Sequence, residues 1–194
     1  MINTILVFLF LIFQSESDSL ISKMQNKFES INNLQADFVQ SSNGQNIMQG
    51  NFYFSKDENY RIELKNNTII SDGKSIWNID NKRSKVIISN IDEDPLAFSL
   101  KEYIYDYPEK CKVTEEKMDK NNSLLILDAN EANLNFKTAK LFVNNEFIIT
   151  KILFEDFTSN QFEFKFTNIN LNTNLSPKLF TFQNDKEYKI IDLR

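Results

Sequence analysis

Apolar and polar residues alternate along most of the chain after residue 34, and this pattern most constrains the fold. A period of two places successive side chains on opposite faces of a β-strand. The alternation is most regular over residues 161–171, where one slip near Asn168 predicts a β-bulge. Turns rich in Asn and Asp, such as Asn43-Gly44, separate the alternating segments. The sequence therefore predicts a long antiparallel sheet, and a sheet of about ten or eleven strands would curl.

Two segments instead follow the period of an α-helix. Asp18 is a suitable N-cap, and Leu20 and Met24 begin the apolar face of the helix that follows it. A second helix is predicted to start at Asp94-Pro95, because proline is favoured at the first helical position. No linker or composition break divides the chain. We therefore expect one α+β domain over residues 18–194, with the helices covering the concave face of the sheet.

The first 17 residues have the features of a cleaved signal peptide. Residues 5–13 are all apolar but too few to span a bilayer as a helix, and Ser15 and Ser17 have the spacing of a signal peptidase site. The alternative is a buried N-terminal strand or helix. No Cys follows the apolar run, so the mature protein is expected to be released rather than lipid-anchored. The predicted location is the periplasm.

Composition argues against most catalytic chemistry. The chain has no His, and its single Cys111 cannot form an internal disulfide, so it is either a reactive thiol or, as we expect, an inert small residue. The acidic run Asp92-Glu93-Asp94 lacks the ligand spacing of a Ca²⁺ loop, so we expect a solvated loop and no metal site. A net charge of −5 argues against nucleic acid. We expect no enzyme activity and no cofactor.

Five short segments occur in an order that resembles one protein family. They are Leu34-Gln35-Ala36-Asp37-Phe38-Val39-Gln40, Gly50-Asn51-Phe52-Tyr53-Phe54, Ser71-Asp72-Gly73-Lys74-Ser75-Ile76-Trp77, Pro95-Leu96-Ala97-Phe98-Ser99-Leu100, and Phe182 followed by Tyr188-Lys189-Ile190-Ile191-Asp192. In this order they resemble the outer-membrane lipoprotein carrier family, LolA, across essentially the whole mature chain.

The resemblance implies a fold and a function. The family fold is an incomplete, half-open antiparallel β-barrel with helices as a lid over an apolar cavity. Such proteins take the acyl chains of triacylated lipoproteins from an inner-membrane Lol ABC transporter, cross the periplasm and pass them to an outer-membrane acceptor, LolB. They do no chemistry on the lipid. A monomer is expected.

The resemblance also implies a latch that holds the lid closed. In the family, a basic residue followed by proline, after the second strand, binds the backbone of the lid. Here Lys56 stands at that place and Asp57 replaces the proline. Because Lys is a poorer multi-donor group than Arg, either Lys56 latches weakly, Arg61 takes over, or no latch exists. Tyr60 falls at an aromatic position near the partner-contact rim of the family.

The expected cavity residues are apolar side chains of the strands and of the second helix. They are Phe38, Phe52, Phe54, Ile62, Leu64, Trp77, Ile79, Leu96, Phe98, Leu100, Phe154, Phe164 and Phe166. For each phenylalanine the alternative is ordinary core packing, although a curled sheet this wide is hard to fill with side chains alone. Ile62, Leu64, Trp77 and Ile79 are expected to share the inward face of their strands.

Two other functions remain open at this point. The same fold also serves lipid-sensing or regulatory domains, usually with an extra domain or an anchor. A carrier of another apolar ligand, such as a glycolipid or a quinone tail, would need the same apolar pocket.

Overall fold

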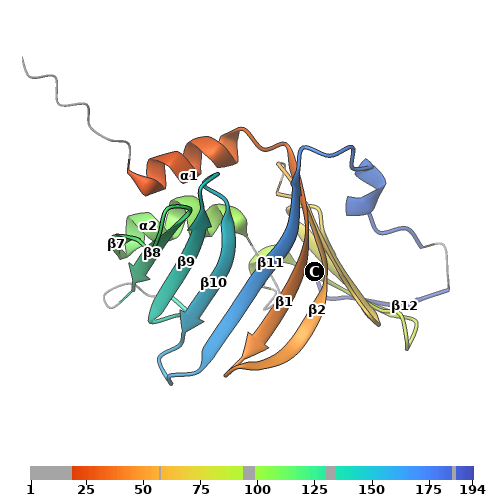
Figure 1. Cartoon of the computed structure of the whole chain (residues 1–194). Coiled ribbons are helices and arrows are strands. Elements are labelled where there is room, and N and C mark those ends of the chain that lie inside the picture. The colour runs from red at the N-terminus through yellow and green to blue at the C-terminus, as the bar shows by residue number, and fades with distance from the viewer. Residues whose placement is uncertain (1–18, 57, 94–98, 130–133, 185–186) are drawn as a thin grey trace, which may run out of the picture.

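The computed structural model describes residues 19–56, 58–93, 99–129, 134–184 and 187–194. Its main element is one sheet of twelve strands, with the helical segments of residues 20–29 and 100–110 on its concave side (Figure 1). The strands are β1 (Asn33–Ser42), β2 (Gln45–Ser55), β3 (Tyr60–Leu64), β4 (Asn67–Ser71), β5 (Ser75–Asp80), β6 (Lys85–Asn90), β7 (Lys112–Lys117), β8 (Asn122–Asp128), β9 (Thr138–Asn144), β10 (Ile149–Glu155), β11 (Gln161–Leu171) and β12 (Lys189–Asp192). The helical elements are α1 (Leu20–Glu29), η1 (Ile91–Glu93), η2 (Glu102–Asp106), α2 (Tyr107–Lys110) and η3 (Pro177–Phe180).

The strand order explains why the barrel is incomplete. The order is β12-β6-β5-β4-β3-β2-β1-β11-β10-β9-β8-β7, so β12 and β7 are the two edges of an open, curved sheet. The predicted half-open antiparallel barrel with helices is confirmed, with twelve strands rather than ten or eleven. One pairing differs from the prediction: β12 runs parallel to β6, because the chain passes through η3 before it returns to the sheet edge.

The turns use residues that accept a left-handed backbone. Asn43 and Gly44 have φ values of 47° and 80°, as the predicted β1–β2 hairpin requires. In the β4–β5 turn, the carboxylate of Asp72 accepts hydrogen bonds from the backbone N–H groups of Lys74 and Ser75. The predicted irregularity near Asn168 is confirmed by a shift in the β1–β11 register and a φ of 51° at Asn168.

Helix α1 begins one residue later than predicted. The Ser19 hydroxyl caps the helix by accepting a hydrogen bond from the Ser22 N–H, while Asp18 lies outside the described residues. The Leu20 N–H donates to the Glu115 carboxylate of β7 at 3.0 Å, which places an anion at the positive end of the helix. Buried Leu20 and Met24 confirm the predicted apolar face.

The second helix is described from Leu100 to Lys110 and is called the inserted helix below. Its first part, η2, is a π-helix. Pro108 follows and has no N–H to donate to the carbonyl four residues earlier, that of Ile104. The Gln25 side chain of α1 donates to this carbonyl at 3.3 Å instead. The predicted helix start, with Leu96 and Phe98, lies outside the described residues, as does the predicted signal peptide over residues 1–17.

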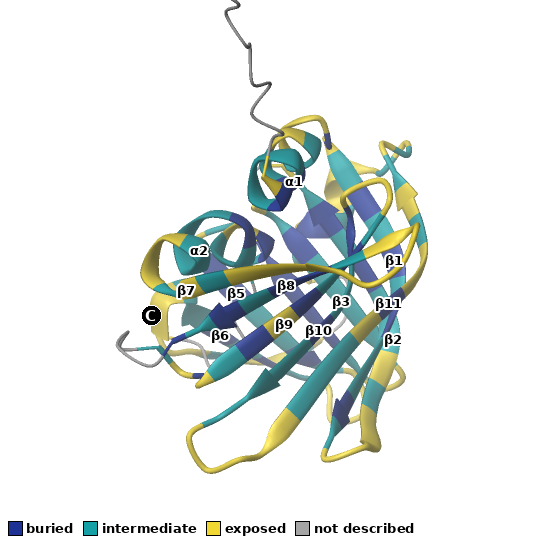
Figure 2. Ribbon diagram, turned by 60° about the vertical axis from the view of Figure 1, so that its left-hand side comes forward, coloured by how far each residue is buried: buried dark blue, intermediate teal, exposed yellow. Residues whose placement is uncertain are grey.

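Buried residues occur along most strands of the sheet (Figure 2), and they form a separate core on each of its faces. The larger core fills the concave face, where α1 and the inserted helix pack on β1–β4 and β8–β11. The smaller core lies on the convex face and contains Ile70, Ile79, Val86 and Ile88. No helix among the described residues has both the length and the apolar character needed to cross a bilayer.

At Gly50 the backbone of β3 lies too close to β2 to leave room for a side chain. A Cβ atom at this position would lie 1.9 Å from the backbone oxygen of Glu63, so no side-chain rotation could relieve the clash. We expect Gly50→Ala to lower the free energy of unfolding by about 1–3 kcal/mol, the usual cost of overpacking. Denaturant unfolding of the purified variant measures this change. Gly44→Ala is the control, since a Cβ there meets nothing within 4 Å and only left-handed strain is added. Wild-type stability in Gly50→Ala would contradict the close approach.

Candidate functional site

The concave face of the sheet is lined with phenylalanine. The rings of Phe52 on β2 and Phe166 on β11 lie 5.8 Å apart, across the intervening strand β1. Farther along the face, Phe154 stacks on Phe162 at 5.3 Å and on Phe164 at 5.8 Å. Phe154 and Phe164 also pack against the concave core, so both groups of rings belong to the same apolar face. Phe162 completes it but was missed by the prediction, although it shares the alternation of Phe164 and Phe166.

Most of the predicted cavity residues lie in the concave core. They are Phe38, Phe52, Phe54, Ile62, Leu64, Leu100, Phe154, Phe164 and Phe166. Among the described residues, every buried side-chain nitrogen or oxygen has a hydrogen-bond partner. The interior of the described structure therefore presents apolar surface and no unpaired polar anchor.

The prediction that Trp77 and Ile79 face the cavity is wrong. In the β4–β5 pairing, Trp77 lies opposite Ile70 and Ile79 lies opposite Thr68, which are on the convex face. Ile76 takes the concave position, because it pairs with Ser71, which in turn pairs with Tyr60. Strand β5 is apolar on both faces, so the alternation alone could not identify the concave one.

A small apolar cavity of about 40 Å³ lies where α1, the inserted helix and the β9–β10 turn meet. It is lined by Met24, Lys27, Phe28, Ile31, Leu34, Leu100, Ile104, Phe147, Ile148 and Ile149. This volume is enough for only a few water molecules. An acyl chain needs much more room, so α1 or the inserted helix has to move before one could enter this cavity.

Polar contacts at the surface tie the inserted helix to its surroundings. The Tyr105 hydroxyl donates to the Glu29 carboxylate of α1 at 2.8 Å, and Gln25 holds the Ile104 carbonyl. At the other side, the Lys101 ammonium lies 3.0 Å from the Glu58 carboxylate of the β2–β3 turn. Glu29, Gln25 and Tyr105 were not predicted, because no local pattern pairs residues about 80 positions apart in the chain.

Among the described residues, Lys56 contacts α1 and not the backbone of the inserted helix. Its ammonium donates to the Glu29 carbonyl at 2.8 Å and lies 3.3 Å from the Glu29 carboxylate. The same carboxylate accepts from Tyr105, so Lys56 is joined to the inserted helix through Glu29. A direct Lys56–lid bond, as the family resemblance implied, is not among the contacts of the described residues.

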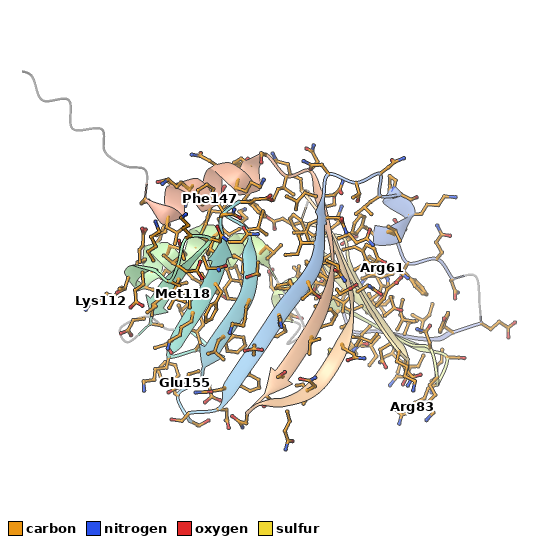
Figure 3. All side chains as sticks on the ribbon, viewed as in Figure 1. Arg61, Arg83, Lys112, Met118, Phe147 and Glu155 are labelled. Carbon is orange, nitrogen blue, oxygen red and sulfur yellow. The ribbon has the colours of Figure 1, made fainter. Side chains whose placement is uncertain are left out.

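Arg61 and Tyr60 do not take the predicted positions. Arg61 lies on the convex face, where it donates to the Leu179 carbonyl of η3 and pairs with Glu63 at 2.6 Å (Figure 3). It therefore holds the C-terminal segment and not the lid. Tyr60 is 1% exposed, so it belongs to the concave core and not to a partner-contact rim. The alternation of β3 fixes both results, since adjacent residues face opposite ways.

The tyrosines of the inserted helix remain protonated donors under physiological conditions. Burial and the hydrogen bond to Glu29 raise the pKa of Tyr105 to about 12. Burial, chiefly, also raises the pKa of Tyr103 and of Tyr107, whose hydroxyl donates to Glu102 at 2.8 Å. Tyr103 and Tyr107, one turn apart on the helix, pack edge to face at 5.1 Å, and Tyr107 packs in the same way on Phe136, just before β9.

The contact at Glu29 is expected to depend on pH. Hydrogen bonds from Tyr105 and then Lys56 hold the pKa of Glu29 below its ordinary value of 4.5. A carboxyl whose pKa is lowered on folding stabilises the fold above its unfolded pKa, and this stabilisation is lost as the pH falls through the lowered value. Glu29→Gln should therefore lower the melting temperature near neutral pH, and the difference from wild type should shrink as the pH falls below 4.5. A difference that is constant over this range would contradict an ionised Glu29 in the contact.

Comparisons with solved structures match this fold. An uncharacterized conserved protein from Thermus thermophilus superposes with a TM-score of 0.61 at 11% identity, over 90% of this chain and 99% of the other. A DUF1329 family protein from Desulfovibrio piger gives a TM-score of 0.50 at 13% identity, over 84% and 94% of the two chains. A LolA superfamily protein from Nitrosomonas europaea gives 0.48 at 13% identity, over 86% and 99%. At these identities the similarity describes the fold alone.

The sequence comparison identifies the family. No curated protein matches the sequence. The family model described as outer membrane lipoprotein carrier protein LolA matches residues 29–183, which span the sheet from the end of α1 to the segment after η3. The matched range includes the concave aromatic face and the inserted helix. The chain therefore belongs to the outer membrane lipoprotein carrier protein LolA family.

Proposed function

We propose that this protein is a periplasmic carrier that binds the acyl chains of lipoproteins between its concave sheet face and its helices. The observation that carries this proposal is the apolar, aromatic concave face, closed by helices that surface contacts tie in place. Such a face suits acyl chains, which need a dry and adaptable surface and no polar anchor. Membership of the LolA family supports the same function.

The energetics favour an exchange between helices and ligand. Moving each CH₂ group from water into the apolar interior contributes about 0.8 kcal/mol. The pairs Lys101–Glu58 and Lys56–Glu29 are exposed, and exposed ion pairs contribute little. An acyl chain can therefore displace α1 or the inserted helix from the concave face. At the acceptor, the helix can return and displace the acyl chain. A carrier needs this balance, because a ligand bound too tightly could not be handed on.

The proposed partners follow from this role. Triacylated lipoproteins are the cargo, an inner-membrane Lol ABC transporter supplies them, and an outer-membrane LolB acceptor receives them. The protein reaches the periplasm through its N-terminal signal and makes or breaks no bond in the lipid. It therefore acts as a transport chaperone and not as an enzyme.

A release assay tests the proposal. Proteoliposomes carrying the cognate transporter, a triacylated lipoprotein and ATP are mixed with the purified mature protein. We expect the lipoprotein in the supernatant as a soluble complex with this protein, and none when ATP is omitted. If the lipoprotein stays in the membrane while circular dichroism shows a folded protein, the lipoprotein carrier function is wrong. Mass spectrometry of lipids extracted with the protein would then show whether a glycolipid or another apolar ligand takes its place.

A further inference from the structure

Two turns carry a residue that does not suit its backbone conformation. Among the described residues, the left-handed positions other than these two are occupied by Gly, by Asn, which both tolerate this conformation, or by the small residue Ser. Glu58 and Phe147, each with a φ of 62°, are the exceptions. A bulky side chain in this conformation is a genuine outlier, and such outliers cluster at sites that bind or move.

Both exceptional side chains reach the helices that cover the concave face. Glu58 pairs with Lys101 of the inserted helix. Phe147 lies at the end of the β9–β10 hairpin nearest α1 (Figure 3) and lines the small cavity together with Leu100 and Ile104. The Lys23 ammonium of α1 lies 5.7 Å from the centre of the Phe147 ring. Both unfavourable backbone conformations are thus found where a turn of the sheet contacts the helices over the concave face.

The β9–β10 turn holds Phe147 in place through Asn144. The Asn144 side-chain oxygen accepts hydrogen bonds from the N–H groups of Glu146 and Ile148, and its carbonyl accepts from Phe147. A three-residue hairpin loop of this kind favours glycine at its left-handed position. Glycine would therefore satisfy the turn better than Phe147 does, so the turn itself gives no reason for a phenylalanine there.

The position of the ring gives such a reason. Phe147 is 36% exposed, while its neighbours in the cavity lining, Ile148 and Ile149, are buried. The ring thus stands between solvent and the apolar interior. Lys27 of α1, half-buried, stands at the same cavity. An acyl chain that entered past Phe147 and reached Met24 or Ile149 would have to pass between α1 and the β9–β10 turn.

We propose that acyl chains pass into the protein between α1 and the β9–β10 turn, and that Phe147 closes this mouth when the protein is empty. The inference rests on the proposed acyl-chain carrier function and adds the place of passage. Phe147 lies in a turn and is partly exposed, so its ring can move aside by side-chain rotation. The mouth can then open without unfolding the sheet.

Acyl-chain exchange kinetics test this proposal. Binding and release of cis-parinaric acid are followed by stopped-flow fluorescence for the wild type and for Phe147→Gly. We expect Phe147→Gly to raise both the binding rate and the release rate about tenfold. Because both rates rise, the affinity should change less than the release rate does. The melting temperature should change little, because relief of strain offsets the lost contacts. The matched control is Phe157→Gly in the β10–β11 turn, whose side chain is 61% exposed at the other end of the sheet and should leave both rates unchanged.

A second variant distinguishes an effect on the mouth from a general folding defect. Phe147→Trp keeps an aromatic ring but enlarges it, so it should slow both rates relative to wild type. Rates that stay at the wild-type value in both Phe147 variants would overturn the proposed mouth while leaving the carrier function intact. Equal acceleration in Phe157→Gly would also overturn it. If the wild type binds neither parinaric acid nor lipoprotein, the carrier function and the mouth are both wrong.

Discussion

A covalent bridge between α1 and the inserted helix should abolish lipoprotein release. The side chains of Glu29 and Tyr105 touch at 2.8 Å, so cysteines at these two positions can be joined by a short, cleavable thiol crosslinker. The bridge holds the helices in the arrangement in which the cavity between them, about 40 Å³, is too small for an acyl chain. Because apparent affinity falls with the fraction of open protein, release should drop by more than about tenfold and return on cleavage of the bridge. The native Cys111 is replaced by Ser in all variants, since it is a free thiol.

The control for this experiment is a crosslink within one strand, which does not restrain the helices. Lys112 and Thr114 are both exposed on the edge strand β7 and lie on the same side of it, two residues apart. Cysteines there should accept the same crosslinker without loss of release. Release at the wild-type rate from the bridged Glu29–Tyr105 protein would show that acyl chains do not need these helices to separate.

Removal of a concave ring should have the largest effect on stability. Phe52 is 2% exposed and contacts Phe166 across the face, so Phe52→Ala leaves a void that its packed neighbours cannot close. Phenylalanine-to-alanine changes in a core lower the free energy of unfolding by about 3–5 kcal/mol. For a domain of this size, each kcal/mol corresponds to about 2–4 °C in melting temperature. Thermal and denaturant unfolding of the purified variant measure the effect.

The matched control for Phe52→Ala is Phe157→Ala. Phe157 is 61% exposed in the β10–β11 turn, so its loss should change the free energy of unfolding by less than about 0.5 kcal/mol. If both variants have similar stability, the concave face is not a packed core in the empty protein. An open, solvent-filled barrel would then describe it better than the closed arrangement.

The sequence predicted the sheet well because its signals are local. The alternation and the Asn-rich turns located the hairpins, and the slip near Asn168 located the bulge. The helix boundaries were less certain, since Ser19 rather than Asp18 caps α1. The predicted phenylalanines that the structure describes reached the concave face, because each shares its alternation with neighbours that must be buried.

The site could not be derived in the same way, because its contacts join distant segments. From the sequence, Lys56 stood at the place of the latch and Arg61 was its possible substitute, both being cations near one turn. The structure separates them: Arg61 faces the convex side and η3, whereas Lys56 reaches Glu29 and through it Tyr105. Nothing in the local pattern indicates which cation lies beside which carboxylate.

By itself, the sequence determined that the chain forms a curled antiparallel sheet with an amphipathic helix, since periodicity and turn chemistry act within a few residues. Only the tertiary structure decided which face of each strand became concave, and it placed Trp77 and Ile79 on the other side. Alternation separates the two faces of a strand, but the pairing register and the direction of curvature choose the one that is covered. The position of Phe147 against α1 was decided in the same way, by a hairpin folding beneath a helix more than 100 residues earlier in the chain.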